Sequence, residues 1–349
     1  MTDPKVCIEV VIPTYNRVSM LLRAVNSVLS QTYSNVKVTV IDNASGDGTF
    51  DAIDEIMKRD PRVKYIKHDS NIGMLGNLNY AFSAVTEDYF CLLTDDDYYS
   101  ENFLNDSFKI LSSNERLGFV ALKSVYFDGR EELIIKETDC LKGGEANFFS
   151  GLESFKYMTS WKFPLSLISI LFRKPLAELY VEFDSLRDVG SDINFLFMCS
   201  AHYSWATCDK IGAYVSVHDE SFSVGKPIIN WPHHVIMDLR MINIIEDARV
   251  SSDIRIHAKK LLIKSLQTKI VFPYFWAVLR KIIISIHKEK PVSFCDADIV
   301  EFSYSDKKFL TVTLRVVNEV PVVRFYVRFC INVFIPLRDF INTRRRTRY

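Results

Sequence analysis

Three consecutive aspartates, Asp95, Asp96 and Asp97, follow a short apolar segment and could carry chemistry. Adjacent carboxylates repel one another unless positive charge lies among them, so packing alone does not account for them. A divalent cation would supply that charge, and oxygen ligands favour Mg²⁺ or Mn²⁺, which commonly bridge protein carboxylates to substrate phosphates. The alternative is a solvated acidic turn in which Ser100 or Asp97 caps the next helix.

Strands and helices that alternate along the chain must position these carboxylates. Apolar, β-rich runs indicate strands, and apolar residues at helical spacing indicate helices. The predicted strands are Val6–Ile12, Val36–Ile41, Val63–Lys67 and Tyr89–Leu93. The predicted helices lie around Leu21–Leu29, Phe50–Lys58 and Leu78–Val85, the last preceded by a loop over Asn71–Asn77. This alternation predicts an α/β fold with a mostly parallel sheet and right-handed crossovers.

The loops that follow the strands are polar and should lie together. Open α/β sheets bind ligands, especially nucleotides, at the carboxyl ends of their strands. Thr14, Asp42 and the aspartate run are therefore expected in one crevice. Beyond Lys109 the pattern weakens, with predicted strands over Leu165–Phe172 and Tyr203–Val217.

Five motifs occur in a recognisable order within the first hundred residues. They are VIPTYNR (11–17), SQTY (30–33), VIDNASGDGT (40–49), NIG (71–73) and the aspartate run. In this order they resemble the family 2 glycosyltransferases of GT-A fold. The resemblance implies a GT-A, Rossmann-like domain that binds a nucleotide-sugar, over residues 1–225. Residues 226–349 are then predicted to form a mainly helical extension.

The resemblance also implies roles for residues of these motifs. Thr14 and Asp42 would help to hold the base and ribose of the donor, because a carboxylate can accept charge-assisted hydrogen bonds from them. The remaining implied donor-binding residues are Tyr15, Asn16, Arg17, Asn71, Gly73 and Asp95. Asp96 and Asp97, with His218, are the implied ligands of Mn²⁺ or Mg²⁺. Many relatives have an aspartate where Thr94 stands, so which aspartates bind the metal stays open, with Asp96 preferred.

Two further polar residues match positions of the same family. Asp192 lies in a segment that resembles the one carrying the catalytic base, where Ser191 replaces the usual first acid. A base there must come within hydrogen-bond reach of the acceptor hydroxyl, whereas the structural alternative is a helix cap before an apolar run. His218 matches a histidine near the diphosphate, and its alternative is an ordinary satisfied polar side chain.

These residues predict transfer of a sugar from a nucleoside diphosphate to a hydroxyl, with inversion implied by the resemblance alone. Two other interpretations remain: a sugar nucleotidyltransferase, and an inactive membrane-associated adaptor of the same fold. A nucleotidyltransferase would be expected to open with a glycine-rich loop carrying Arg and Lys, whereas this chain has Pro13–Arg17. The intact aspartate run and Asp192 speak against an adaptor.

Charge is distributed unevenly between the two parts of the 349-residue chain. Residues 1–230 carry 32 acidic and 22 basic side chains, and the remainder carries 11 and 21. Arg324, Arg328 and Asn332 recur every four residues among apolar side chains, as in an interfacial helix on an anionic membrane; a packed helix with solvated arginines is the alternative. Nucleic-acid binding is not expected, because the basic residues cluster with apolar ones.

The cellular setting is predicted from three features. The seven cysteines are scattered without a CxxC pair, which favours a reduced cytoplasm. No secretory signal and no membrane-spanning helix are expected. A peripheral protein on the cytoplasmic face of the inner membrane follows, with a lipid-linked saccharide as acceptor. Bacterial O-antigen or capsule biosynthesis is the setting that the resemblance implies.

Overall fold

The structure is a computed structural model that describes residues 5–128, 134–137, 146–159, 165–182, 191–218, 249–265 and positions 241, 244, 245 and 247. The chain forms two compact units, residues 1–226 and 227–349. The second unit contributes helix α9 (Ser252–Ser265) to the described residues. The basic and aromatic C-terminal segments predicted to bind membranes lie outside the described residues.

The first unit alternates strands and helices over its first hundred residues, as predicted. Its described strands are β1 (Ile8–Thr14), β2 (Val36–Asp42), β3 (Val63–Lys67), β4 (Tyr89–Leu92), β5 (Tyr98–Tyr99), β6 (Leu117–Asp128), β7 (Ile134–Glu137), β8 (Asn147–Phe149), β9 (Ile170–Arg173) and β10 (Ser204–Val217). Its described helices are α1 (Val18–Leu29), α2 (Thr49–Met57), α3 (Gly73–Ser83), α4 (Phe103–Ser112), α5 (Gly151–Thr159), the 3₁₀ turn η1 (Leu167–Ser169), α6 (Pro175–Glu182) and α7 (Ser191–His202).

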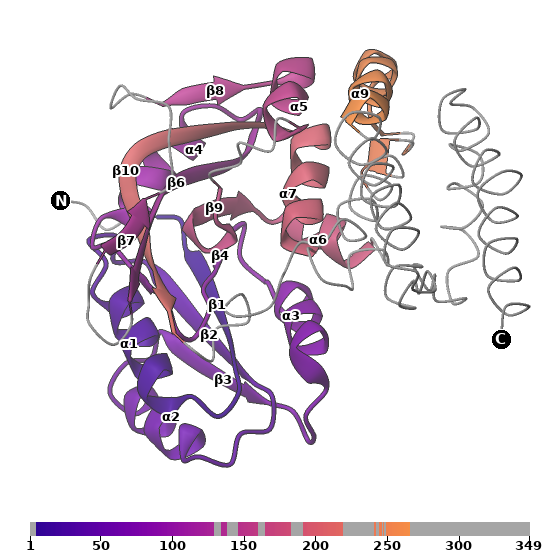
Figure 1. The fold of residues 1–349 in the computed structure, drawn as a ribbon. Helices are drawn as coiled ribbons and strands as arrows, with labels where there is room; N and C mark the ends of the chain where they lie inside the picture. The colour runs from indigo at the N-terminus through magenta and orange to yellow at the C-terminus, as the bar shows by residue number, and fades with distance from the viewer. Residues whose placement is uncertain are drawn as a thin grey trace, which may run out of the picture. The chain divides into compact units, whose positions relative to one another are not determined.

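These strands form one mixed sheet in the order β3-β2-β1-β4-β9-β6-β10-β5, with β7 beside β6 and β8 beside β10. Strands β1 to β4 are mutually parallel, whereas β9 runs antiparallel to both β4 and β6. Figure 1 shows α1 and α2 on one side of the sheet and α3 on the other. The neighbouring strands β2, β1 and β4 therefore end at a common edge, where their loops meet.

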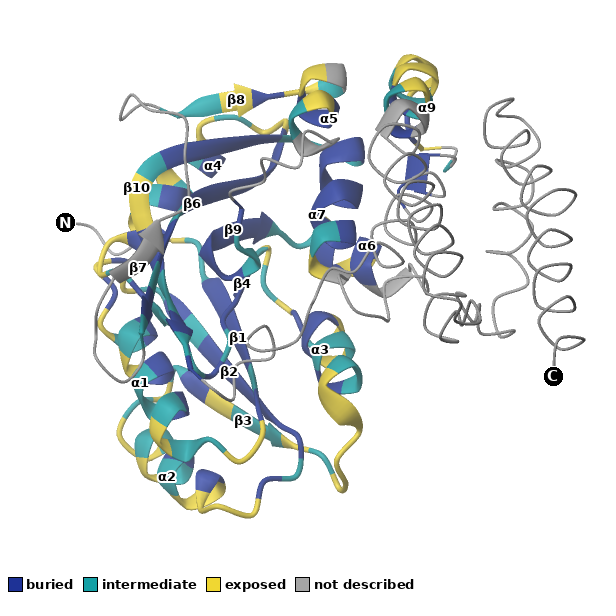
Figure 2. Ribbon diagram, viewed as in Figure 1, coloured by how far each residue is buried: buried dark blue, intermediate teal, exposed yellow. Residues whose placement is uncertain are grey.

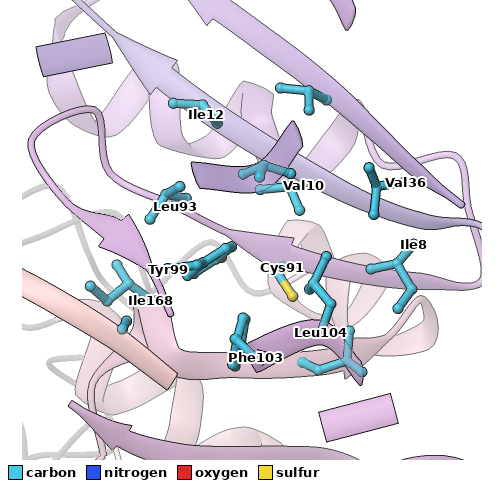
Figure 3. Packing of buried hydrophobic residues seen from close by; sticks show 14 of the residues in the cluster. Ile8, Val10, Ile12, Val36, Cys91, Leu93, Tyr99, Phe103, Leu104 and Ile168 are labelled. Atoms are coloured by element: carbon cyan, nitrogen blue, oxygen red, sulfur yellow. The ribbon is translucent and has the colours of Figure 1, made fainter. Parts of the chain in front are cut away.

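The core explains why β1 is an almost continuous apolar run. Ile8, Val10 and Ile12 are fully buried and pack in one cluster with Leu21 and Val25 of α1. Figure 3 shows part of this cluster, and Figure 2 shows that β1, β2 and β4 are largely buried. A strand with both faces covered needs apolar residues at nearly every position.

An aromatic cluster covers the other face and anchors α7 to the sheet. The Phe195 ring of α7 lies 5.0 Å from Phe82 of α3 and 5.5 Å from Phe172 of β9, measured between ring centroids. Tyr180 of α6 stacks on Phe82 at 3.8 Å. Because α7 begins at Ser191, this packing fixes the helix turn that carries Asp192.

Two predicted elements differ from the observed ones. The loop predicted over Asn71–Asn77 is wrong beyond Ile72, because α3 already begins at Gly73, whose φ of 80° starts the helix after a left-handed turn. The strand predicted over Leu165–Phe172 begins only at Ile170, since the three residues before it form η1. Strand β6 was not predicted.

Glu9 is a buried carboxylate in the middle of β1. Its Oε1 accepts a hydrogen bond from Thr39 Oγ1 at 2.6 Å and lies 3.0 Å from Lys37 Nζ. Its Oε2 accepts the backbone N–H groups of Thr86 at 2.7 Å and Glu87 at 3.2 Å. Burial alone would raise the pKa of Glu9, but the hydrogen bonds from Thr39, Thr86 and Lys37 lower it below the ordinary value.

We expect Glu9→Ala to lower the free energy of unfolding at pH 7 by about 3–5 kcal/mol, because it leaves buried donors and a lysine without their shared acceptor. A lowered folded-state pKa stabilises the protein above the ordinary glutamate pKa and is lost as the pH falls through the folded value. The loss measured by urea denaturation should therefore shrink in acid.

Glu87→Ala is the matched control, because Glu87 contacts the same Lys37 at 3.5 Å but is about one-third exposed. Its cost should stay below about 1 kcal/mol. Equal costs for Glu9→Ala and Glu87→Ala would contradict the buried network.

Candidate active site

The ends of β1 and β2 bring the first two predicted site residues together. Thr14 and Asp42 are register partners in the parallel pair, and each is the last residue of its strand. The backbone N–H of Asn43 donates to the Thr14 carbonyl at 3.0 Å, which extends the pairing by one residue into the loops. The two loops therefore leave the sheet side by side, next to the end of β4.

The acidic loop after β4 closes against Thr14 and the loop that follows it. Thr14 Oγ1 donates to Asp95 Oδ2 at 2.8 Å, in a buried hydrogen bond. Arg17 Nη1 lies 3.3 Å from Asp95 Oδ1 and 3.1 Å from Asp96 Oδ2. On the other side, His218 Nε2, just after β10, lies 3.1 Å from the same Asp96 oxygen. Residues 204 positions apart in the sequence, from 14 to 218, thus meet at this edge of the sheet.

Asp97 is directed into the protein instead. Its Oδ1 accepts the backbone N–H of Ser216 at 2.7 Å, and its Oδ2 is hydrogen-bonded to Thr94 Oγ1. Burial raises the pKa of Asp97, and the neighbouring charge of Asp96 adds to the shift. Burial likewise raises the pKa of Asp95. Asp97 thus ties the acidic loop to β10, which keeps Asp96 facing His218.

Asp42 is fully buried, and its two oxygens hold the loop that follows it. Oδ1 accepts the backbone N–H of Ser45 at 2.9 Å, and Oδ2 accepts the hydroxyl of Tyr65. Both oxygens of Asp42 are thus bonded within the protein, and in this structure its carboxylate is not exposed for the predicted contact with base and ribose. Asp42 stabilises the loop after β2 through its hydrogen bond with Ser45. Its contact with a nucleotide stays a prediction.

The remaining predicted donor residues form the rim of these loops. Asn16 adopts a left-handed conformation with φ of 53°, which asparagine tolerates better than most residues, and its side chain accepts the Gly46 N–H at 2.9 Å. Asn71 Oδ1 accepts the Asn43 side-chain amide at 2.9 Å and the Gly73 N–H at 2.8 Å. Tyr15 is exposed at the same rim. Asparagine side chains thus link the first, second and third βα loops.

Arg23 is a site residue that the sequence did not reveal. Its Nη2 donates to the Asp96 carbonyl at 2.5 Å, and its guanidinium lies 5.0 Å from the centroid of the Tyr98 ring. It therefore braces the backbone of the acidic loop from α1, across 73 positions of sequence. In the sequence, an arginine of an amphipathic helix that contacts another loop looks the same as one that faces solvent. No sequence signal therefore marked Arg23.

Asp192 lies in the first turn of α7, and its side chain remains exposed. Desolvation by the surrounding protein nevertheless raises its pKa. Hydrogen bonds from the backbone N–H groups of Ile193 and of Asp192 itself lower the pKa and partly offset this shift. Burial also raises the pKa of Tyr126 on β6, and the negative charges of Asp97 and Asp192 add to that shift. Tyr126 therefore lies within electrostatic reach of both the aspartate run and the predicted base.

The described residues contain no group of three or more His, Cys, Asp and Glu side chains that could hold a metal ion. Asp96 and His218 form a pair that offers one carboxylate oxygen and one imidazole nitrogen. Mg²⁺ and Mn²⁺ are commonly bound through one or two protein groups, with water and substrate phosphates as the other ligands. The pair fits such an ion provided that a diphosphate contributes. The oxygens of Asp97 are bonded to Ser216 and Thr94 in this structure, and its role as a metal ligand stays a prediction.

The fold and this edge of the sheet define an α/β protein of the GT-A type. Residues 9–179 match the family model described as glycosyl transferase family 2, and this part of the chain belongs to that family. The prediction of the family and of the GT-A fold is thereby confirmed.

Two curated relatives carry glycosyltransferase names. One is an uncharacterised glycosyltransferase of Haemophilus influenzae, 27% identical over 160 residues that make up 45% of this chain and 44% of that protein. The other is the putative colanic acid biosynthesis glycosyl transferase WcaA of Escherichia coli, 32% identical over 100 residues, 28% of this chain and 35% of that protein. The chain thus spans less than half the length of each.

Two solved structures share the fold. The TarS fragment of residues 1–349 from S. aureus, in complex with UDP-GlcNAc, aligns with a TM-score of 0.55 at 16% identity, covering 75% of this chain and 73% of that one. The mannosyltransferase PcManGT from Pyrobaculum calidifontis, in complex with GDP-Man and Mn²⁺, aligns with a TM-score of 0.50 at 15% identity, covering 91% and 82%. At these identities the likeness concerns the fold alone.

Proposed function

We propose that this protein transfers a sugar from a nucleoside diphosphate donor to a hydroxyl group of an acceptor. The observation that carries the proposal is the cluster of Arg17, Asp95, Asp96 and His218 beside Thr14, at the edge where parallel α/β sheets bind nucleotides. The family membership favours this reaction over nucleotidyl transfer. The two structural neighbours with bound nucleotide-sugars support the donor class.

In this mechanism Asp192 accepts the proton of the acceptor hydroxyl while that oxygen attacks the anomeric carbon. The bond from the anomeric carbon to the diphosphate oxygen breaks, and the nucleoside diphosphate leaves with the electron pair. One displacement of this kind inverts the anomeric centre. Arg17 contributes positive charge beside the leaving group. Mg²⁺ or Mn²⁺ held by Asp96 and His218 would supply further charge to the diphosphate when bound.

The acceptor belongs to the same proposal: a lipid-linked saccharide used in bacterial surface polysaccharide biosynthesis, such as O-antigen or capsule. The relative WcaA, named for colanic acid biosynthesis, supports this setting. Among the described residues, no helix is long and apolar enough to cross a membrane. We propose that the basic and aromatic C-terminal segments hold the protein at the anionic cytoplasmic face of the inner membrane, where such an acceptor lies.

A donor screen tests the reaction. The full-length protein is incubated with UDP-, GDP-, dTDP- and CDP-sugars in the presence of a cell-extracted lipid fraction, with Mn²⁺ or with EDTA. We expect release of one nucleoside diphosphate in Mn²⁺ and its loss in EDTA. Release that does not change with EDTA would contradict the metal, and no release from any donor would count against the transferase in favour of an inactive adaptor.

The membrane prediction has its own test. Reversing two charges with Arg324→Glu and Arg328→Glu should lower binding to anionic liposomes by about tenfold or more, since each basic residue near the surface contributes about 1 kcal/mol. Lys58→Glu with Arg59→Glu is the control, because both side chains are exposed directly after α2 in the first unit. Co-sedimentation should separate the two double variants, and equal binding by both would contradict the C-terminal contact.

A further inference from the structure

Arg17 bridges two carboxylates of the acidic loop, those of Asp95 and Asp96. Its Nη1 lies 3.3 Å from Asp95 Oδ1 and 3.1 Å from Asp96 Oδ2. The two carboxylates have side chains only 8% and 14% exposed, so their charges are poorly solvated. An arginine guanidinium carries a permanent positive charge in proteins. Arg17 therefore supplies a positive charge that this loop requires.

The same oxygen of Asp96 would have to serve a metal ion. Asp96 Oδ2 already has two nitrogens around it, from Arg17 and from His218, each at 3.1 Å. A divalent cation bound to this oxygen would meet the positive charge of Arg17 at close range, where like charges repel strongly in a partly buried site. Arg17 and the cation therefore compete for Asp96.

The backbone around Arg17 is held by hydrogen bonds that do not involve its side chain. Its carbonyl accepts the N–H of Leu21 at 2.9 Å in the first turn of α1, and Asp47 Oδ2 accepts the N–H of Val18 at 3.0 Å. The preceding Asn16 is fixed to the next loop by the hydrogen bond of its backbone N–H to Ser45 Oγ at 2.8 Å. The side chain of Arg17 is 27% exposed, so the exchange inferred below requires a change of its rotamer and leaves these backbone bonds in place.

A diphosphate is the ligand that suits a displaced guanidinium. Arginine binds phosphate oxygens through parallel charge-assisted hydrogen bonds, which are shorter and stronger than neutral ones. The donor diphosphate proposed above would arrive at this edge of the sheet with the oxygens that a metal ion also needs.

We propose that Arg17 is an exchangeable counter-ion: it neutralises Asp95 and Asp96 in the ligand-free protein and passes to the donor diphosphate when a divalent cation takes its place on Asp96. This inference rests on the proposed function. It makes cation and donor binding interdependent, because a cation alone must displace Arg17 without offering it a new partner. Coupling between two ligands is reciprocal, so each should strengthen the binding of the other.

The test is Mn²⁺ binding by the full-length protein, followed by the loss of the free-ion EPR signal, without nucleotide and with UDP, GDP, dTDP or CDP. The variants are Arg17→Gln and Arg17→Lys, with Arg62→Gln as the control. The Arg62 side chain is about as exposed as that of Arg17, and it pairs with Asp60 away from the site. Circular dichroism and urea denaturation establish that each variant is folded.

We expect wild type and Arg62→Gln to bind Mn²⁺ at least about tenfold more tightly with one of the nucleotides than without, within the usual range of such couplings. Arg17→Gln should bind Mn²⁺ at least about tenfold more tightly than wild type without nucleotide, and the gain from nucleotide should shrink. Arg17→Lys keeps the charge and should lie between the two.

Equal Mn²⁺ affinity of wild type and Arg17→Gln without nucleotide would overturn the exchange, and so would Mn²⁺ binding by none of the proteins under any condition. Either result leaves the proposed transfer standing if nucleotide-sugar is still turned over in the donor screen. Failure of that screen, with the coupling of Mn²⁺ and nucleotide intact, would instead overturn the transfer and leave the exchange supported.

Discussion

Replacing Asp192 by asparagine should lower kcat by about 10²- to 10⁴-fold, the usual contribution of a positioned general base. Asparagine keeps the size of the side chain and can still accept the backbone N–H groups at the start of α7, but it cannot take a proton from the acceptor hydroxyl. The KM for the donor should change little, because the cluster at the ends of β1 and β4 is untouched. Steady-state rates of nucleotide release with acceptor present measure both constants.

This substitution also separates the base from its structural alternative. Asparagine caps helix N-termini about as well as aspartate does, so a residue that only starts α7 would tolerate the change. Full activity of Asp192→Asn would therefore contradict the base and favour the cap. Asp192→Ala is the companion variant: for a pure cap it should reduce stability, and for the base it should reproduce the loss of kcat.

The pH profile gives a second check on Asp192. Desolvation by the surrounding protein raises its pKa above the ordinary aspartate value. A base must be deprotonated to act, so kcat should fall as the pH drops through this raised pKa, at a higher pH than an unperturbed carboxylate would give. Asp192→Asn should flatten this acid limb in the residual rate. An unchanged acid limb in the variant would show that another group produces it.

The second large effect is expected at Asp96. Asp96→Asn should lower kcat by about 10²- to 10³-fold, the typical loss when one charge-stabilising group of a transition state is removed. Its Oδ2 is the atom on which Arg17 and His218 converge. The remaining activity should also respond less to Mn²⁺ than that of wild type. Rates measured across a Mn²⁺ titration give both quantities.

Asp106→Asn is the matched control for Asp96→Asn. Asp106 on α4 forms its ion pair with Lys210, whose side chain is about half exposed, and is not a member of the described cluster, so kcat should stay within about twofold of wild type. Activity of Asp96→Asn within a few-fold of wild type, at every Mn²⁺ concentration, would place the catalytic charge elsewhere.

The strand and helix order of the first hundred residues was predictable because each buried strand is a nearly uninterrupted apolar run. Ile8 to Ile12 shows the reason: neither face of β1 meets water, and its one charged residue, Glu9, is fully satisfied by neighbours. The motif positions at the strand ends follow from the same order, which is why Thr14, Asp42 and Asp95 were expected at one edge. The structure places all three there.

What the sequence could not give is the direction of each side chain. Asp95, Asp96 and Asp97 are chemically equal neighbours, yet Asp97 bonds to β10 while Asp96 faces His218. That division depends on a strand more than one hundred positions away, whose pairing is a property of the whole sheet. The ion pairs of Arg17 cross 78 and 79 positions for the same reason.

The start of α3 was missed for a local reason. Gly73 and Gly76 lower the helical propensity of the segment from Asn71 to Asn77, so propensity alone favours a loop. In the fold, Asn71 accepts the Gly73 N–H and the buried Asn77 donates to the Ile41 carbonyl at 3.2 Å. The local bond at Asn71 and the tertiary bond at Asn77 together outweigh the weak helical propensity, and the helix begins at Gly73.

The most direct measurement is mass spectrometry of the lipid-linked saccharides from cell extract after incubation with the protein, Mn²⁺ and the donor selected by the screen. We expect a product heavier than the acceptor by one glycosyl residue with wild type, and none with Asp192→Asn or in EDTA. Donor that is bound, with no saccharide or other hydroxyl acceptor gaining mass, would contradict glycosyl transfer. Equal product from Asp192→Asn would contradict the assigned base.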